Sequence, residues 1–284
     1  MEPAPLLLRE TARRWLAEGR KAVQIEVTQA RGSVPRRAGT RMLVSADACV
    51  GTIGGGHLEL KAIAHARTLL RDAAAAGRSS VEESLHFPLG PALGQCCGGA
   101  VTLGFARLDA AALARWPAEP ALFALQLYGA GHVGRAIARA LLPLDVRVDW
   151  IDERDEEFPA HTGKAAAPWP AHLRKVCVDA VEAEVDSAAP GGFFLVLTHR
   201  HDLDLRITEA ILRRGDFGFL GLIGSATKKA RFEHHFARRG IAADRIARMT
   251  CPIGLPGISG KQPEVIAAAV VAQLLQAADR PATR

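Results

Sequence analysis

The hydrophobic and polar positions in the first part of the chain follow two spacings, one typical of helices and one typical of strands. Residues 6–18 repeat apolar side chains at helical spacing and are followed by Gly19, which predicts an amphipathic helix. Residues 21–30, KAVQIEVTQA, alternate apolar and polar side chains, the period of a half-buried strand. Similar patterns predict strands at 40–45, 81–87 and 100–106 and a long helix that begins after Gly56 and ends near residue 75. We therefore expect residues 1–106 to form a small α+β domain.

From residue 122 onward, strand and helix patterns follow one another in strict alternation. This order is typical of a parallel sheet with helices on both faces, the α/β class. We interpret 107–121, rich in Ala and Pro without a clean period, as a linker, and 122–284 as a Rossmann-like domain. The predicted strands are 122–128, 146–151, 175–178, 193–198, 217–223 and 249–251, and the predicted helices are 132–142, 203–214, 226–239 and 264–277.

Composition and charge exclude several function classes. A chain of 284 residues is long enough for two domains. The net charge of +6 comes mostly from Arg in an Ala- and Arg-rich chain, and aromatic residues are only 5%, so we expect no nucleic-acid partner. The longest apolar run, 265–275, is too short to span a membrane, and the N-terminus lacks a signal-peptide pattern. Five cysteines without a disulfide framework lead us to expect a cytoplasmic protein with reduced thiols.

The clearest fold motif is Gly129-Ala130-Gly131-His132-Val133-Gly134, between a predicted strand and a predicted helix. Gly129, Gly131 and Gly134 suit the tight turn, the backbone approach to a phosphate and the close helix packing of a dinucleotide-binding site. Asp152 follows at the end of the next strand, where a ribose-binding acid lies in such sites. NAD is thus a candidate cofactor, whereas the acidic run 152–157 disfavours the 2′-phosphate of NADP.

Two further glycine turns precede predicted helices. Gly54, Gly55 and Gly56 form one, and the other ends at Gly224 and Ser225, ahead of the helix that carries Lys228. Both turns would present backbone N–H groups at a helix N-terminus, which suits an anion. The alternative is that glycine only ends one element and starts the next.

The segment Thr198-His199-Arg200-His201-Asp202 follows another predicted strand. The His-x-His-Asp spacing suggests a metal, but no matching Cys/His cluster lies nearby in the sequence. We interpret Asp202 as the N-cap of the next helix, with His199 or His201 facing the ligand. Hydrolase, kinase and metalloprotease motifs (GxSxG, the P-loop, HExxH) are absent from the sequence.

Cys96 and Cys97 are adjacent in the glycine-rich turn Gly90-Pro91-Ala92-Leu93-Gly94-Gln95-Cys96-Cys97-Gly98-Gly99. Thiols on such a turn are accessible to a metal, an electrophile or a sulfur donor. The alternative is that one thiol packs beneath the turn and the other has no role.

Taken in order, these motifs resemble those of the XdhC/CoxI family, accessory proteins of molybdenum hydroxylases such as xanthine dehydrogenase. The resemblance covers nearly the whole chain and rests on GSVPR at 32–36, GTIGGGHLE at 51–59, QCCGG at 95–99, 128–134, DER at 152–154, THRHD at 198–202, 221–225 and CPIG at 251–254.

The resemblance implies an accessory factor rather than a turnover enzyme. Family members are understood to bind and protect molybdenum cofactor, to work with a cysteine desulfurase that replaces an oxo ligand by sulfur, and to insert the cofactor into a xanthine dehydrogenase-type hydroxylase. We expect the cofactor phosphate on a glycine turn of the second domain and the metal toward Cys96 and Cys97. A homodimer is also expected. The alternatives are an NAD-dependent oxidoreductase, a cysteine persulfide or redox relay, and a protein-binding adaptor.

Overall fold

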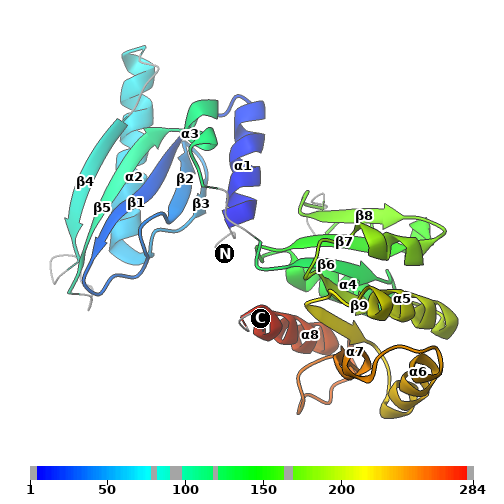
Figure 1. Ribbon diagram of the computed structural model, residues 1–284. Coiled ribbons are helices and arrows are strands. Elements are labelled where there is room, and N and C mark those ends of the chain that lie inside the picture. Colours follow the sequence, from blue (N-terminus) through cyan, green and yellow to red (C-terminus); the bar gives the residue numbers. More distant parts are fainter. Residues whose placement is uncertain (1–4, 78–81, 90–97, 118–120, 163–168, 280–284) are drawn as a thin grey trace. The chain divides into compact units, whose positions relative to one another are not determined.

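The computed structural model of the chain describes residues 5–77, 82–89, 98–117, 121–162 and 169–279 (Figure 1). The chain divides into two compact units, Met1–Glu119 and Pro120–Arg284. Each unit has its own sheet and its own hydrophobic core.

The first unit is built on a five-stranded antiparallel sheet of order β3-β2-β1-β5-β4. The central strand, β1, has the alternating pattern that the sequence predicts, so successive side chains face opposite sides of the sheet. The strands are β1 (Ala22–Arg31), β2 (Arg41–Ser45), β3 (Cys49–Gly51), β4 (Glu82–Pro88) and β5 (Ala100–Arg107).

Helices pack against both faces of this sheet. The long helix α2 (Gly56–Ala75) contributes Leu58, Ala62 and Ala66 to the core on the face of Val23 and Ile25. Helices α1 (Pro5–Ala17) and α3 (Ala110–Ala114) enclose a second cluster around Ala22 and Leu43 on the opposite face. The α+β character expected of the first domain is present in this unit.

The second unit contains a six-stranded parallel sheet of order β11-β10-β9-β6-β7-β8. Strands β7 and β8 lie on one side of β6, and strands β9, β10 and β11 lie on the other side. The order in which successive strands join the sheet therefore reverses between β6 and β9, although all six strands run parallel. Ligands of open parallel sheets bind at such a switch, at the carboxyl ends of the strands. The strands are β6 (Ala124–Tyr128), β7 (Arg147–Asp152), β8 (Leu173–Cys177), β9 (Phe193–Val196), β10 (Phe219–Leu222) and β11 (Met249–Thr250).

Helices cover both faces of the parallel sheet, which confirms the predicted α/β fold class (Figure 1). Helices α4 (His132–Leu141) and α8 (Pro263–Ala278) pack on the face of Leu125 and Leu127. The opposite face is covered by α5 (His201–Arg214), α6 (Ala226–Arg238), α7 (Ala243–Ala247) and the 3-10 helix η3 (Val181–Ser187); a second 3-10 turn, η2 (Asp155–Glu157), follows β7.

Short elements depart from the sequence expectations. β3 forms in a segment for which the sequence pattern predicts no strand, and α3 forms inside the range 107–121 that we interpret from the sequence as a linker. Within that range, Trp116 donates its indole N–H to Gln24 of β1 at 2.6 Å. Elements of three to five residues are too short for periodicity to reveal, since tertiary contacts stabilise them.

Candidate binding pocket of the second unit

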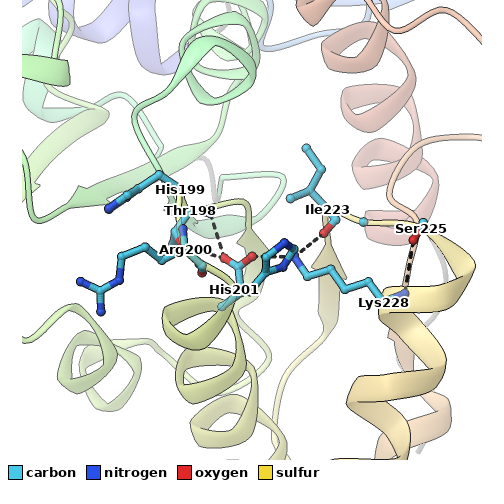
Figure 2. A pocket seen from close by; sticks show the side chains of 9 residues that line it. Thr198, His199, Arg200, His201, Ile223, Ser225 and Lys228 are labelled. Atoms are coloured by element: carbon cyan, nitrogen blue, oxygen red, sulfur yellow. Dashed lines mark hydrogen bonds and ion pairs between the residues drawn. The ribbon is translucent and has the colours of Figure 1, made fainter.

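A cavity of about 250 Å³ opens at the carboxyl ends of the neighbouring strands β9 and β10 (Figure 2). One wall is the loop after β9 with the start of α5, and the other is the loop after β10 with the start of α6. Its lining residues are mostly polar: Thr198, His199, Arg200, His201, Asp204, Ile223, Gly224, Ser225 and Lys228. The predicted site residues His199, Gly224 and Ser225 therefore line one pocket.

Asp204 organises the β9 side of this pocket. Its carboxylate is 2% exposed, and Oδ1 accepts hydrogen bonds from the Thr198 amide at 2.9 Å and the Thr198 hydroxyl at 2.7 Å. The Thr198 oxygen in turn accepts the Arg200 amide at 3.3 Å. The loop from β9 into α5 is thereby fixed by a carboxylate in the first turn of the helix that follows it.

Lys228 connects the other wall to the same carboxylate. Its Nζ lies 2.6 Å from Asp204 Oδ2 and donates a second hydrogen bond to the Ile223 carbonyl at 2.9 Å (Figure 2). The Lys228 side chain is 9% exposed, so this ion pair is largely removed from water. Ser225 caps α6 by accepting the Lys228 amide at 3.2 Å. The pair thus joins α5, α6 and the end of β10.

The basic side chains at the rim have acidic neighbours. Glu153, just after β7, lies 3.5 Å from His199 Nε2 and 3.4 Å from Arg200 Nη1. Arg200 also pairs with Asp202 at 2.9 Å. These contacts bring the loops after β7 and β9 together at the switch between β6 and β9. Hydrogen bonding and charge from Arg200 lower the pKa of Asp202 to about 2.

The structure corrects the prediction that Asp202 caps α5. The N-cap position belongs to Arg200, which makes no side-chain capping bond, and Asp202 lies inside the first turn. The carboxylate that binds the preceding loop is Asp204 instead. The Asp202 side chain is exposed and forms ion pairs with both Arg200 and Arg206.

The predicted glycine loop follows β6 and enters α4. A side chain at Gly129 would meet the Leu197 carbonyl oxygen at 2.4 Å, and one at Gly134 would meet the Gly129 carbonyl oxygen at 2.0 Å. A side chain at Gly131, by contrast, would have no atom within 4 Å. Gly129 and Gly134 are thus required by packing within the protein, and Gly131 leaves open space at the start of α4.

Asp152 lies beside this loop, 4% exposed, and its carboxylate is occupied by protein donors. Oδ2 accepts the Ala130 amide at 2.6 Å and Arg154 Nη2 at 3.0 Å, and Oδ1 accepts the amide and Nε of Arg154, each at 3.0 Å. Burial by itself raises the pKa of Asp152, but the hydrogen bonds from Arg154 and Ala130 outweigh it and hold the pKa below its usual range. A ribose at this carboxylate would have to displace one of these donors, since four bonds fill its acceptor positions.

Three motifs of the first unit meet around the N-terminus of α2. A side chain at Gly54 would meet Pro35 Cγ at 2.5 Å, and one at Gly99 would meet the Ser33 carbonyl oxygen at 2.4 Å. The loop 31–37, the turn 51–57 and Gly98-Gly99 are therefore in close contact. Cys96 and Cys97, predicted to face the metal, lie outside the described residues.

The chain's own Glu59 occupies amides of the Gly54-Gly55-Gly56 turn. Its Oε2 accepts the amides of Ile53 at 3.2 Å and Gly55 at 3.0 Å, and it also accepts the Thr52 hydroxyl. A carboxylate in the first turn is stabilised by the helix dipole and by these donors. The anion at this turn is thus an internal side chain, whereas the α6 turn at Gly224 and Ser225 borders an open cavity.

Sequence reasoning missed the importance of Asp204 and Lys228, which are 24 residues apart. The sequence did contain one signal for Lys228. This lysine follows the N-cap residue Ser225 by three positions, just after the end of a predicted strand. Among the described residues, no cluster of three or more His, Cys, Asp or Glu side chains is arranged to hold a metal ion. Within the same residues, no helix is both long and apolar enough to cross a membrane.

Fold and pocket define an α/β protein that combines a Rossmann-type unit, open at the ends of β9 and β10, with a smaller α+β unit. Residues 125–274 match the family model of the XdhC Rossmann domain, and residues 15–82 match that of the XdhC and CoxI family. The chain belongs to the XdhC and CoxI family, as its sequence motifs predict.

Two individual proteins illustrate the relationship. The uncharacterized protein YqeB of Escherichia coli K12 is 32% identical over 263 residues, which are 88% of this chain and 42% of YqeB. The chain thus spans less than half the length of this relative. A crystal structure described as a xanthine dehydrogenase from Bacillus halodurans superimposes with a TM-score of 0.70 over 97% of both chains, at 17% identity. At that identity the similarity shows a shared fold.

Proposed function

We propose that this protein is an accessory factor of a xanthine dehydrogenase-type molybdenum hydroxylase, and that it holds molybdenum cofactor for insertion into that enzyme. Family membership supports the accessory role. The observation that carries the binding role is the polar cavity between α5 and α6, which is lined by Arg200, Lys228, two histidines and a serine.

The chemistry of the cofactor suits such a cavity. Molybdenum cofactor is a pterin dithiolene with a terminal phosphate, so a protein that carries it needs hydrogen-bond donors for an anion. Lys and Arg side chains and the N-termini of α5 and α6 are groups of this kind. In this proposal Gly224 and Ser225 hold the phosphate end, with His199 at the rim.

In this proposal the thiols of Cys96 and Cys97 would contact the metal of the bound cofactor, and a cysteine desulfurase would be the partner that supplies sulfur to the cofactor. Thiolates suit soft, sulfur-rich metal centres. The first unit supports this role by packing Gly98-Gly99 against the loop 31–37, which fixes one end of the cysteine turn. In the NAD-dependent alternative, a ribose would compete with Arg154 and Ala130 for Asp152.

The test is to purify the protein from a host that makes the cofactor and to measure bound molybdenum and oxidised pterin. We expect both to co-purify in comparable amounts, and the loaded protein to activate an apo-hydroxylase. Cys96→Ala and Cys97→Ala should reduce metal retention or activation, while Cys177→Ala, an exposed cysteine on an edge strand, serves as the control. Preparations without pterin and without effect on the hydroxylase would refute the proposal.

A further inference from the structure

The pocket wall contains a buried cation, Lys228, beside a buried carboxylate, Asp204. Lys228 is 9% exposed and its partner Asp204 is 2% exposed. Replacing such a buried pair with apolar residues of similar volume is often neutral or stabilising, so the pair is weak evidence of a purely structural role. Its place in the wall of a cavity suggests instead that the ammonium serves a ligand.

Lys228 retains a donor for such a ligand. An ammonium group has three N–H donors, and the bonds to Asp204 and to the Ile223 carbonyl use two of them. Because Lys228 lines the cavity, the third can be donated to a group bound there. Asp204 and the end of β10 hold the ammonium in place, so little side-chain freedom is lost on binding.

Two further donors of the cavity come from different elements. The Ser225 oxygen accepts the Lys228 amide, which leaves the Ser225 hydroxyl hydrogen for a ligand. The His201 ring, at the first position of α5, makes no hydrogen bond with the described residues. Donors from α5 and α6 that converge from different directions suit a tetrahedral oxyanion better than a flat carboxylate.

We propose that Lys228 contacts the ligand's oxyanion directly, that Asp204 positions it, and that the group bound is a phosphomonoester. This inference rests on the proposed function and assigns the phosphate end of the ligand to Lys228. The size of the cavity is consistent with a bound phosphomonoester. Its volume of about 250 Å³ is several times the roughly 30 Å³ that one water molecule occupies in the liquid. The cavity therefore has room for a phosphate and the first atoms of the group that carries it.

The experiment titrates the full-length protein with inorganic phosphate at fixed ionic strength by calorimetry. Saturable binding is expected for the wild type. Lys228→Met should weaken it by roughly ten- to hundredfold, the usual effect of losing a hydrogen bond to a charged group. Lys229→Met is the matched control, because Lys229 is on the same helix, pairs with Glu233 and does not line the cavity. The affinity of the Lys229→Met variant for phosphate should equal that of the wild type.

A second variant separates binding from folding. Lys228→Met leaves Asp204 without its cation and can destabilise the protein. The double variant Asp204→Asn, Lys228→Met removes both charges and keeps an oxygen for the Thr198 donors. It should be folded and should still bind phosphate weakly. Wild-type affinity in this variant, or no saturable binding to the wild type, would overturn the inference.

Cofactor loading distinguishes this inference from the proposed function. If pterin and molybdenum co-purify equally with the wild type and with Lys228→Met, Lys228 is not the phosphate ligand and the proposed function stands. If phosphate binding depends on Lys228 but no pterin co-purifies with the wild type, the oxyanion site stands and the proposed function fails.

Discussion

At the scale of single residues, the carboxylate of Asp152 shows that an acid at a position typical of a ribose-binding residue can be bound by the protein itself. The sequence places an acid at the end of β7, and the structure confirms that position. Its hydrogen bonds, however, run to the Ala130 amide and to Arg154. Asp152 therefore stabilises the glycine loop from within the protein.

The lowered pKa of Asp152 makes this role measurable. Since its folded-state pKa lies below the unfolded value of about 3.9, the carboxylate stabilises the fold above pH 4 and loses that contribution as the pH falls through the folded pKa. Asp152→Asn should lower the free energy of unfolding by about 1–3 kcal/mol at pH 7, because an amide cannot accept all four bonds. The deficit should shrink below about pH 4, as urea unfolding at several pH values would show.

Glu156→Gln is the control for this experiment, because Glu156 is an exposed acid in the adjoining η2 turn. It should leave both the stability and its pH dependence unchanged. An Asp152→Asn deficit that stays constant down to pH 2 would contradict a role for the ionised carboxylate.

Two glycines of the loop after β6, Gly131 and Gly134, should respond differently to the same substitution. Gly134→Ala places a methyl group against the Gly129 carbonyl and should cost more than about 3 kcal/mol, since backbone atoms cannot move aside. Gly131→Ala meets open space and should cost less than about 1 kcal/mol, mainly because Ala is a poorer N-cap. Thermal and urea unfolding of the two variants test this; equal losses would contradict the packing argument.

At the scale of elements, local patterns predicted the strands and helices that carry the site, whereas partners distant in sequence could not be predicted. Strand β6, the glycine loop and α4 follow one another directly in the sequence, so their chemistry is local. The pair of Asp204 and Lys228 forms only because β9 and β10 are neighbours in the sheet. A single sequence does not contain that neighbour relation explicitly. The N-cap of α5 was misplaced for a local reason, because Asp204 rather than Asp202 binds the loop that precedes the helix.

Helix α3 and Trp116 show the same limit in the first unit. Their segment has no clean period, yet Trp116 is 7% exposed and lies in the cluster with α1. Trp116→Phe should reduce the free energy of unfolding by about 1–3 kcal/mol, because the buried Gln24 oxygen loses its donor. Arg115→Ala, at a neighbouring exposed position, should have little effect. Equal stability of Trp116→Phe and the wild type would contradict a stabilising role for the hydrogen bond from Trp116 to Gln24.

At the scale of the whole molecule, each of the hydrophobic clusters found among the described residues draws its members from one unit. Two clusters flank the sheet of β6–β11, and the other two flank the sheet of β1–β5. Within each unit, local opening is therefore governed by the contacts of its own two clusters.

Hydrogen exchange measured by mass spectrometry tests whether the two cores respond independently. Gly134→Ala should speed amide exchange in β6–β11 and leave β1–β5 protected, because its clash lies within the second unit. Trp116→Phe should do the reverse, since its lost hydrogen bond lies within the first. Faster exchange in both sheets for either variant would show that the units unfold together. Independent responses would mean that a ligand bound only at Lys228 protects the second unit alone, because binding stabilises the structure that contains its site.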